Sequence, residues 1–414
     1  MAEVGGLKTI HIHLSVLLFA IYCSPCSFYE FLGPALPNRT FISVWNAPTS
    51  ACESRWGINI NLSSFDIVTN RGQTFYGESI VLLYSNIGLW PYINDKGDKI
   101  NGGIPQLGNL SAHLDKALDD LLKVVPDPDF QGIGVIDWEA WRPVFDRNWD
   151  SKTIYKEASE ALVKQQHPDW SSKAIETEAR KQFEDTAKDY MLQTLQLAKK
   201  TRHKALWGYY GFPRCYNGKG PSDCSGVVKA ENDQLSWMFE SSSIIFPSIY
   251  LSPSLPRNRS STFAKYSILE AFRLAVDEHG SNLPVFPYVR IVYAQTQIFL
   301  NKADMYSTIV QAAKLGTAGV IIWGASSDME NAEFCTELYN YIEGFVGPLI
   351  KTLSDIAQDC SMQYCSFHGR CRFEMDPPWS ESIQINSLKN SWKFVECLCF
   401  DGWSGKKCNA PDIW

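Results

Sequence analysis

Two acidic residues, separated by one aromatic residue, follow the most strand-like stretch of the chain, GIGVIDWEAWRP at 132–143. Residues i and i+2 of a strand point to the same face, so Asp137 and Glu139 should stand together while Trp138 points away. Two carboxylates at that spacing cannot both ionise cheaply, so one pKa should rise. A carboxyl group that keeps its proton near neutral or mildly acidic pH suits a general acid, for example one that protonates a glycosidic oxygen.

This pair is too close to be the two opposed carboxylates of an ordinary retaining or inverting glycosidase, which lie on either side of the scissile bond. A one-sided pair needs a different nucleophile, and the acetamido oxygen of an N-acetylated sugar can serve. Asp137 would then hold and polarise the acetamide N–H while Glu139 protonates the leaving oxygen. Taken alone, a D-x-E at a strand end is more often a cap or an ion-pair partner.

The elements that must position these acids are short apolar runs alternating with helical patterns. Strand–helix alternation repeated about seven times indicates an α/β fold with a parallel sheet, and a distorted (β/α) barrel of the TIM type is the economical arrangement. An open doubly wound sheet is the alternative, although no glycine-rich phosphate loop follows any strand. The expected strands are 41–46, 80–85, 132–139, 205–212, 243–251, 283–293 and 319–324, and the expected helices are 109–125, about 171–200, 262–279, 303–315 and 333–358.

The ends of the expected strands are rich in aromatic residues. In a βα barrel the active site lies at the C-terminal ends of the strands, so these side chains would converge with the two acids on one rim. An aromatic-lined cleft with paired carboxylates is typical of a glycoside hydrolase, although Tyr and Trp at single strand ends more often pack than bind sugar. The strand-end residues are Trp45, Asn46, Tyr84, Tyr209, Tyr210, Tyr250 and Trp323.

The charge of the chain bears on its partners. The net charge is −7 without any Lys/Arg block, which argues against nucleic acid as a partner. A polyanionic sugar would instead require a basic strip along the cleft, and high salt should weaken its binding. The candidates for this strip are Arg55, Arg142, Arg214 and Arg290. No ligand cluster demands a metal ion, and no cofactor is expected.

The N-terminal region predicts entry into the secretory route. The apolar run LSVLLFAIY at 14–22 is too short to span a bilayer and has the length of a signal-peptide core. A signal peptide at 1–26, cleaved between Cys23 and Phe28, is expected, with an uncleaved anchor as the alternative. No later segment is long and apolar enough to cross a membrane, so the mature protein should be secreted or lysosomal. Glycosylation sequons fit this route and stand at Asn38, Asn61, Asn109 and Asn258.

The cysteines divide the chain into two unequal parts. Loss of Cys23 and Cys26 with the leader leaves an even number, as disulfides in an oxidising compartment require. Six cysteines crowd the end of the chain, which predicts a catalytic domain at 27–355 and a small disulfide-held module at 356–414. The end, CLCFDGWSGKKC, has the spacing C-x-C-x5-G-x2-C and resembles the last half of an EGF-like module. A generic Cys-rich tail or a zinc site is the alternative, and a single tail His, His368, argues against zinc.

Five sequence blocks together resemble a known family. VIDWEAWRP, with WGYYGFPRCYN, FPSIY, GGIPQLGNLSAHL and GVIIWG, is similar to the hyaluronidase family of glycoside hydrolases, from about Phe41 to Trp414. The EGF-like tail resembles that of vertebrate-type members. The resemblance implies a distorted barrel without a metal. It also implies an endo-β-N-acetylhexosaminidase that cuts the β-1,4 bonds from N-acetylglucosamine to glucuronate in hyaluronan, with side activity on chondroitin and retention of configuration.

The resemblance also implies roles for individual residues. Glu139 would be the proton donor, and Asp137 would position the acetamido group, whose carbonyl attacks the anomeric carbon to give an oxazolinium-like intermediate. The acetamido group would be flanked by Tyr210, Tyr250 and Trp323, with Tyr84 at the cleft. Arg142, next to the acids, is a further candidate that could steady a carboxylate by charge.

The family pattern extends to the disulfides and has one departure. The implied pairs are Cys52–Cys335, Cys215–Cys224, Cys360–Cys371, Cys365–Cys397 and Cys399–Cys408. Some relatives carry an acid just after the aromatic residue of the sixth strand, where this chain has VYAQTQ with Ala294 and Gln295. If that acid tunes the carboxylate pair, the pH optimum should differ here.

Two rival functions remain open at this point. A hydrolase that prefers chondroitin is the nearest, because the two polymers differ in one hydroxyl orientation and in sulfation, and pocket contacts would decide between them. The rival from another class is a glycan-binding surface protein with weak or no catalysis. The presence of both acids and all the aromatic positions argues against lost activity.

Overall fold

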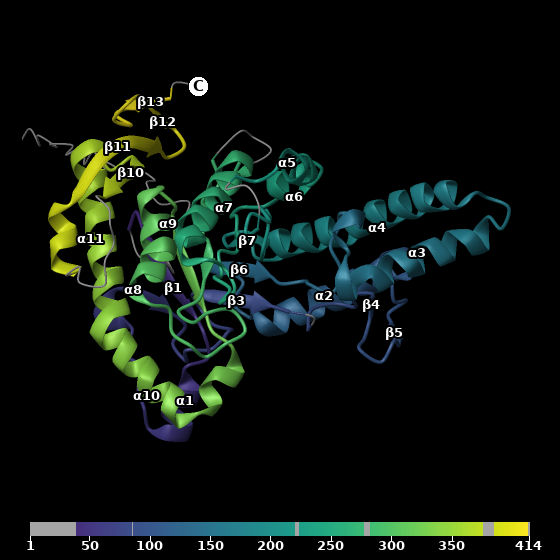
Figure 1. The fold of residues 1–414 in the computed structure, drawn as a ribbon, viewed down its shortest axis with the longest axis horizontal. Coiled ribbons are helices and arrows are strands. Elements are labelled where there is room, and N and C mark those ends of the chain that lie inside the picture. The colour runs from purple at the N-terminus through teal and green to yellow at the C-terminus, as the bar shows by residue number, and fades with distance from the viewer. Residues whose placement is uncertain (1–38, 85, 220–222, 277–281, 376–384, 413–414) are drawn as a thin grey trace, which may run out of the picture.

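The computed structural model describes residues 39–84, 86–219, 223–276, 282–375 and 385–412 (Figure 1). The expected signal peptide and the sequon at Asn38 lie outside the described residues. Within the described residues, no helix is both long enough and apolar enough to cross a bilayer.

Two parallel sheets lie at the centre of the molecule. Their strands are β1 (Ile42–Asn46), β2 (Ile67–Thr69), β3 (Ile80–Leu83), β6 (Ile133–Ile136), β7 (Leu206–Tyr209), β8 (Tyr288–Val289) and β9 (Gly319–Trp323). One sheet has the order β2-β1-β9-β8 and the other the order β3-β6-β7. Parallel bridges from Tyr210 to Phe246 and from Ser248 to Tyr288 link them, so the strands follow one another in one array from β3 to β2.

The two ends of this array are joined by a side chain. Asn70 follows β2 and is buried. Its amide nitrogen donates to the Ile80 carbonyl at 2.8 Å, and its Oδ1 accepts from the backbone N–H groups of Ser79 and Ile80, both at 3.0 Å. The amide of Asn70 thus replaces the strand pairing between β2 and β3, because it satisfies backbone groups that would otherwise be buried without partners.

One apolar cluster takes side chains from β1, β3, β6, β7, β8 and β9. On β1, β3 and β6 its members are two residues apart, as for Ile42 and Val44 or Ile133 and Val135, so one face of each of these strands points into the same core. Gly134 lies between the last two, and a Cβ there would come within 2.2 Å of the Trp207 ring. A glycine is therefore required for β6 and β7 to pack at this point.

Helices surround the strands. They are α1 (Ser50–Trp56), α2 (Leu110–Val124), α3 (Thr153–Gln166), α4 (Ser172–Thr201), α5 (Gly226–Asp233), α6 (Ser236–Ser241), α7 (Ser260–Leu274), α8 (Lys302–Met305), α9 (Gln311–Lys314), α10 (Ala332–Tyr341) and α11 (Gly347–Tyr364). The long pair α3 and α4 runs antiparallel and projects well beyond the sheets (Figure 1). Asn109 and Ser171 cap α2 and α4 by accepting a backbone N–H, as their side chains favour.

Several elements differ from those expected: β2 and α3 were not predicted, and the expected helix 262–279 ends at Leu274. The stretch 243–251 pairs only through isolated bridges, and 283–293 contains only the two-residue β8, since Pro247, Pro284 and Pro287 have no N–H to donate to a ladder. The expected helices 303–315 and 333–358 are each interrupted by a π-helical turn, at Tyr306–Val310 and Ile342–Val346. The expected strand 132–139 ends at Ile136, so both acids lie just beyond it.

The C-terminal region is built from two small antiparallel pairs. β10 (Gly369–Met375) pairs with β11 (Trp392–Cys399), and β12 (Trp403–Ser404) pairs with β13 (Ala410–Pro411). Figure 1 shows the β10–β11 hairpin alongside α11, which crosses residue 355 without a break. The structure contains the disulfides Cys52–Cys335, Cys215–Cys224, Cys360–Cys371, Cys365–Cys397 and Cys399–Cys408, which are the pairs that the family resemblance implied.

The disulfide Cys52–Cys335 should matter most for stability. It joins residues 283 apart, whereas Cys215–Cys224 joins residues 9 apart, and a cross-link removes more entropy from the unfolded chain when its loop is longer. Double replacement of Cys52 and Cys335 by Ala should lower the free energy of unfolding by about 2–5 kcal/mol. Urea denaturation of this variant and of the Cys215/Cys224 double Ala variant measures both losses. An equal or larger loss for the shorter loop would contradict this ranking.

Candidate active site

The two acids lie in the turn that follows β6. The backbone N–H of Asp137 donates to the Leu83 carbonyl at 2.7 Å, which anchors this turn to the end of β3. Trp138 is buried and stacks on Trp90 with ring centroids 4.6 Å apart, so it points away from the acids as expected. Asp137 is largely covered, whereas the Glu139 side chain is 59% exposed.

The electrostatic environment of Asp137 is unusual. Its burial, reinforced by the negative charge of Glu139 and opposed by Arg214, raises the pKa of Asp137 to about 8. Its Oδ1 atom is buried and has no hydrogen-bond partner among the described residues. The rise in pKa that the spacing predicted therefore falls on Asp137, which holds its proton at mildly acidic pH and keeps one oxygen ready to accept a hydrogen bond.

Four of the predicted aromatic residues form a continuous series beside the acids. The indole N–H of Trp323 donates to the Tyr84 hydroxyl at 3.1 Å, and its ring stacks on Tyr250 with centroids 6.1 Å apart. The Tyr210 ring lies 6.1 Å from Tyr250, and its hydroxyl donates to Ser248 at 3.3 Å. Burial raises the pKa of Tyr84, of Tyr210 and of Tyr250, so all three stay neutral hydroxyl groups.

Two other strand-end aromatics have structural positions. Tyr209 is buried and donates its hydroxyl to the Met191 carbonyl at 2.9 Å, which ties β7 to α4. Trp45 is buried and donates its indole N–H to Thr49 at 3.0 Å. Both side chains pack against the outer helices instead of lining the site.

Further polar groups at these strand ends lack partners. Both side-chain polar atoms of Asn46 and the hydroxyl of Tyr288 are buried without a hydrogen bond among the described residues. The Tyr288 ring lies 4.8 Å from Tyr210, and burial together with the charge of Asp137 raises the pKa of Tyr288. Orphaned polar groups are rare in folded proteins, and several at one end of a sheet indicate a place for a polar ligand. Sequence reasoning missed Tyr288, because it assigned the whole of 283–293 to a long strand.

A cavity of about 300 Å³ opens directly beside the acids. It is lined by Tyr84, Tyr92, Asp137, Trp138, Glu139 and Ala140. Tyr92 comes from a small hairpin of β4 (Tyr92–Ile93) and β5 (Lys99–Ile100), and no sequence signal pointed to it. The cavity size is suited to a small polar ligand such as one sugar ring.

The four arginines predicted to line the cleft lie in different places and contact different groups. Arg214 is close to the acids, since its Nη2 lies 3.4 Å from Glu139 Oε1. Arg142 instead donates to the Arg147 carbonyl at 2.6 Å and covers the Trp149 ring at 4.9 Å, so its guanidinium is not the one that contacts Glu139. Arg290 is buried in an ion pair with Asp328 at 3.0 Å, and Arg55 is exposed on α1.

Lys152 is a cation that sequence reasoning missed. Its ammonium donates to the backbone carbonyls of Glu139 and Ala140, so it fixes the turn that carries the acids. Burial and the neighbouring charge of Arg142 lower the pKa of Lys152. Lys152 stands 13 residues after Glu139 in a different element, so only the tertiary fold brings the two together.

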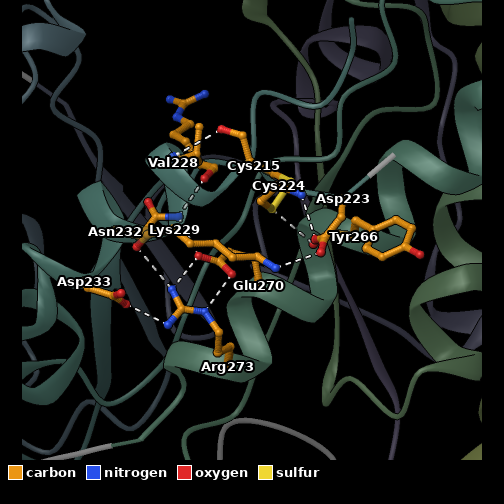
Figure 2. Close-up of polar contacts among 12 residues, drawn as sticks. Cys215, Asp223, Cys224, Val228, Lys229, Asn232, Asp233, Tyr266, Glu270 and Arg273 are labelled. Atoms are coloured by element: carbon orange, nitrogen blue, oxygen red, sulfur yellow. Dashed lines mark hydrogen bonds and ion pairs between the residues drawn. A yellow bond between two sulfur atoms is a disulfide. The ribbon is translucent and has the colours of Figure 1, made fainter. Parts of the chain in front are cut away.

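A buried polar network fixes the backbone at Arg214. Asn232 on α5 donates to the Arg214 carbonyl at 2.9 Å and to Glu270 at 2.8 Å. Figure 2 shows Arg273 reaching both Glu270 and Asp233, and Glu270 is 1% exposed. The disulfide Cys215–Cys224 follows Arg214 directly. The backbone that carries Arg214 is thus fixed at several points.

The other predicted features lie away from this cavity. Asn61 and Asn258 are exposed, and Asn109 is exposed while its side chain caps α2 through the Ala112 N–H at 3.1 Å. Among the described residues, no three His, Cys, Asp or Glu side chains come together as a metal site would require.

Comparison with known proteins gives one consistent result. The family model described as hyaluronidase matches residues 31–380. Human hyaluronidase-1 is 39% identical over 93% of this chain and 95% of that protein, and rat hyaluronidase-3 is 37% identical over 91% and 93%. The crystal structure of bee venom hyaluronidase in complex with a hyaluronic acid tetramer superposes with a TM-score of 0.71 at 36% identity, over 75% of this chain and 98% of that one. The chain therefore belongs to the hyaluronidase family of glycoside hydrolases.

Proposed function

We propose that this chain is an endo-acting hydrolase that cuts hyaluronan at the β-1,4 bonds from N-acetylglucosamine to glucuronate. The observation that carries this proposal is the pair formed by Asp137, with its raised pKa and unpartnered Oδ1, and the exposed Glu139 beside one cavity. The bee venom relative, solved with a hyaluronic acid tetramer, supports the choice of polymer.

In the first step, Glu139 in its protonated form donates to the glycosidic oxygen as the bond to the anomeric carbon breaks. The acetamido carbonyl oxygen of the same sugar forms a bond to that carbon from the opposite face and gives an oxazolinium-like intermediate. Asp137 Oδ1 accepts the acetamide N–H, which orients the carbonyl for attack. The hydroxyl groups of Tyr210 and Tyr250 and the ring of Trp323 enclose the acetamido group, while Tyr84 lies at the mouth of the cleft.

In the second step, the Glu139 carboxylate takes a proton from a water molecule that attacks the anomeric carbon. The bond to the acetamido oxygen breaks and the acetamide is restored. Two inversions at one carbon give net retention of configuration. Covering the acetamido group with aromatic side chains keeps water from that face, so that water reaches the anomeric carbon from the side of Glu139.

We infer that the parallel array is a closed, distorted barrel. The single apolar cluster shared by its strands and the Asn70 side chain between β2 and β3 support closure. The region 356–414, with three disulfides and two antiparallel pairs, is proposed to be an EGF-like module attached to a catalytic domain at 27–355. With a signal peptide at 1–26 and occupied sequons, the protein would be secreted or lysosomal.

The experiment that tests the function is a direct cleavage assay. The secreted full-length chain is incubated with hyaluronan and, separately, with unsulfated chondroitin across about pH 4 to 7, where carboxylates and histidine titrate. New reducing N-acetylhexosamine ends are counted. Hyaluronan should be cut, and the chondroitin arm tests the chondroitin-preferring alternative. Folded protein that cuts neither polymer would instead support a glycan-binding protein.

Replacement of Arg214 by Gln tests the role of the cleft cation. The guanidinium opposes the rise in the Asp137 pKa and pairs with the Glu139 carboxylate, so its loss should weaken binding of a polyanion and raise that pKa further. We expect KM for hyaluronan to rise about tenfold and to depend less steeply on salt. Lys181→Gln, which removes a charge 69% exposed on α4, is the control. An unchanged KM and salt dependence for Arg214→Gln would contradict this role.

A further inference from the structure

A second and larger cavity lies where the C-terminal region meets the rest of the chain. Its volume is about 620 Å³, and it is enclosed by the end of α7, the segment leading to β8 and the residues around β11. Its lining shares no residue with the cavity beside Asp137 and Glu139. Its lining includes Arg370, Arg372, Phe272, Phe400, Asp401 and Asp412.

The strand β10 directs two arginines toward this cavity. Alternate residues of a strand face opposite sides, and Cys371 and Phe373 are buried in the core that includes α11. Arg370 and Arg372 therefore face the cavity. Arg372 is satisfied there, because it donates to Glu396 and to the Leu315 carbonyl, the latter at 3.2 Å, and covers the Phe272 ring at 5.2 Å.

Arg370 lacks an ion pair among the described residues, whereas the buried Arg290, whose Nε also has no hydrogen-bond partner there, has one. Arg370 is only 9% exposed, and its Nε is buried with no hydrogen-bond partner among the described residues. Its guanidinium lies 5.2 Å from the Phe400 ring centroid. Arg290, by contrast, pairs with Asp328, and Arg202 donates to the Val125 carbonyl at 2.9 Å. Burial lowers the pKa of Arg370 to about 10, against the charge of Asp401, so the group remains a cation near neutral pH.

A buried cation without a paired anion is costly, and proteins retain one where it has a use. We propose that this cavity is a second sugar-binding site, in which Arg370 binds the carboxylate of a uronic acid residue. The choice of a uronate among carboxylates rests on the proposed function. The guanidinium matches a carboxylate in geometry, and the cavity volume lies in the range of small-ligand sites.

The remaining lining selects for this kind of ligand. Phe272 and Phe400 offer apolar surface to a sugar ring, while Asp401 and Asp412 can accept hydrogen bonds from its hydroxyl groups. The two acids also oppose a ligand of higher negative charge, since like charges in a covered site repel. A singly charged, hydroxyl-rich ring is therefore favoured over sulfate or phosphate.

The test uses the full-length Glu139→Gln protein, which should leave sugar chains uncut. Binding of D-glucuronate is followed by saturation-transfer NMR in this background, alone and with Arg370→Gln or Lys181→Gln added. Glucuronate binding should weaken about tenfold with Arg370→Gln and should persist with Lys181→Gln. D-Glucose and inorganic sulfate should bind more weakly than glucuronate. Equal glucuronate binding with and without Arg370, or sulfate binding as tight as that of glucuronate, would overturn the proposal.

Thermal unfolding separates this role from a structural one. Loss of an unpaired buried charge should leave Tm unchanged or raise it, whereas loss of a structural arginine should lower Tm. Glucuronate should raise Tm of the protein that has Arg370 and leave that of Arg370→Gln unchanged. Arg370→Gln could have a lower Tm or fail to fold, as expected for a structural arginine. If Arg370→Lys then folds normally but is not stabilised by glucuronate, the proposed binding site is refuted. Hyaluronan cleavage by the wild type is measured separately, so failure of the proposed function would not be mistaken for failure of this site.

Discussion

Replacement of Glu139 by Gln should reduce kcat for hyaluronan cleavage by about 10³-fold, within the range usual for loss of a general acid. The amide has nearly the same shape as the carboxyl group but cannot donate a proton to the glycosidic oxygen. Because the Glu139 side chain is 59% exposed, its loss should barely change folding. Initial rates of reducing-end release, measured with wild type and variant at several substrate concentrations, give kcat and KM separately.

Glu176→Gln is the matched control for this experiment. Glu176 is similarly exposed, at 56%, and pairs with Arg180 on α4, away from the cavity. It should keep full activity and an unchanged Tm. A Glu139→Gln protein that retains activity within tenfold of the wild type would show that another group protonates the leaving oxygen, and the assignment of Glu139 would then fail.

Replacement of Asp137 by Asn should have opposite effects on activity and on stability. Activity should fall by about 10²-fold or more, because the Asn side chain holds and polarises the acetamido group of the substrate less effectively than the Asp carboxyl group does. The free energy of unfolding of Asp137→Asn should exceed that of the wild type, and the excess should be larger at higher pH. The folded pKa of Asp137, about 8, is above the ordinary value of 3.8, so its ionisation in the unfolded chain favours unfolding over this range.

The sign of the pH effect follows from proton uptake. Between about pH 4 and 8 the folded chain holds a proton on Asp137 that the unfolded chain has lost, so stability falls as pH rises, by about 1.4 kcal/mol per pH unit. Asn does not titrate. The difference in unfolding free energy between Asp137→Asn and wild type should therefore grow from pH 5 to pH 8, by at most about 4 kcal/mol.

Urea denaturation at pH 5, 6, 7 and 8 measures this difference. All other titrating groups are shared by the two proteins, so their contributions largely cancel. A difference that stays constant across this range would show that Asp137 titrates at its ordinary pKa. The raised pKa and its proposed place under the acetamido group would then both need revision.

The arginines show how far a sequence-based prediction of the site can go. The sequence offers both Arg142 and Arg214 as candidates, and proximity in the chain favours Arg142, which stands three residues after Glu139. The chain turns sharply after Ala140, however, and Asn148 accepts the Arg142 backbone N–H at 2.9 Å while the Arg142 guanidinium turns toward Arg147 and Trp149. Arg214, 75 residues from Glu139 in sequence, is the one that reaches its carboxylate.

Local periodicity and short blocks of residues were enough to predict the alternation of strands and helices, the two acids and four aromatic residues at strand ends, and the family. The folded structure is needed to show which cations lie near the acids, that Asp137 has the raised pKa, and that Tyr92 and Lys152 lie beside the acids. It also shows that Arg370 Nε is buried with no hydrogen-bond partner in the described part of the chain. The physical reason is that burial and charge pairing depend on segments distant in the chain, and desolvation acts only once those segments have packed.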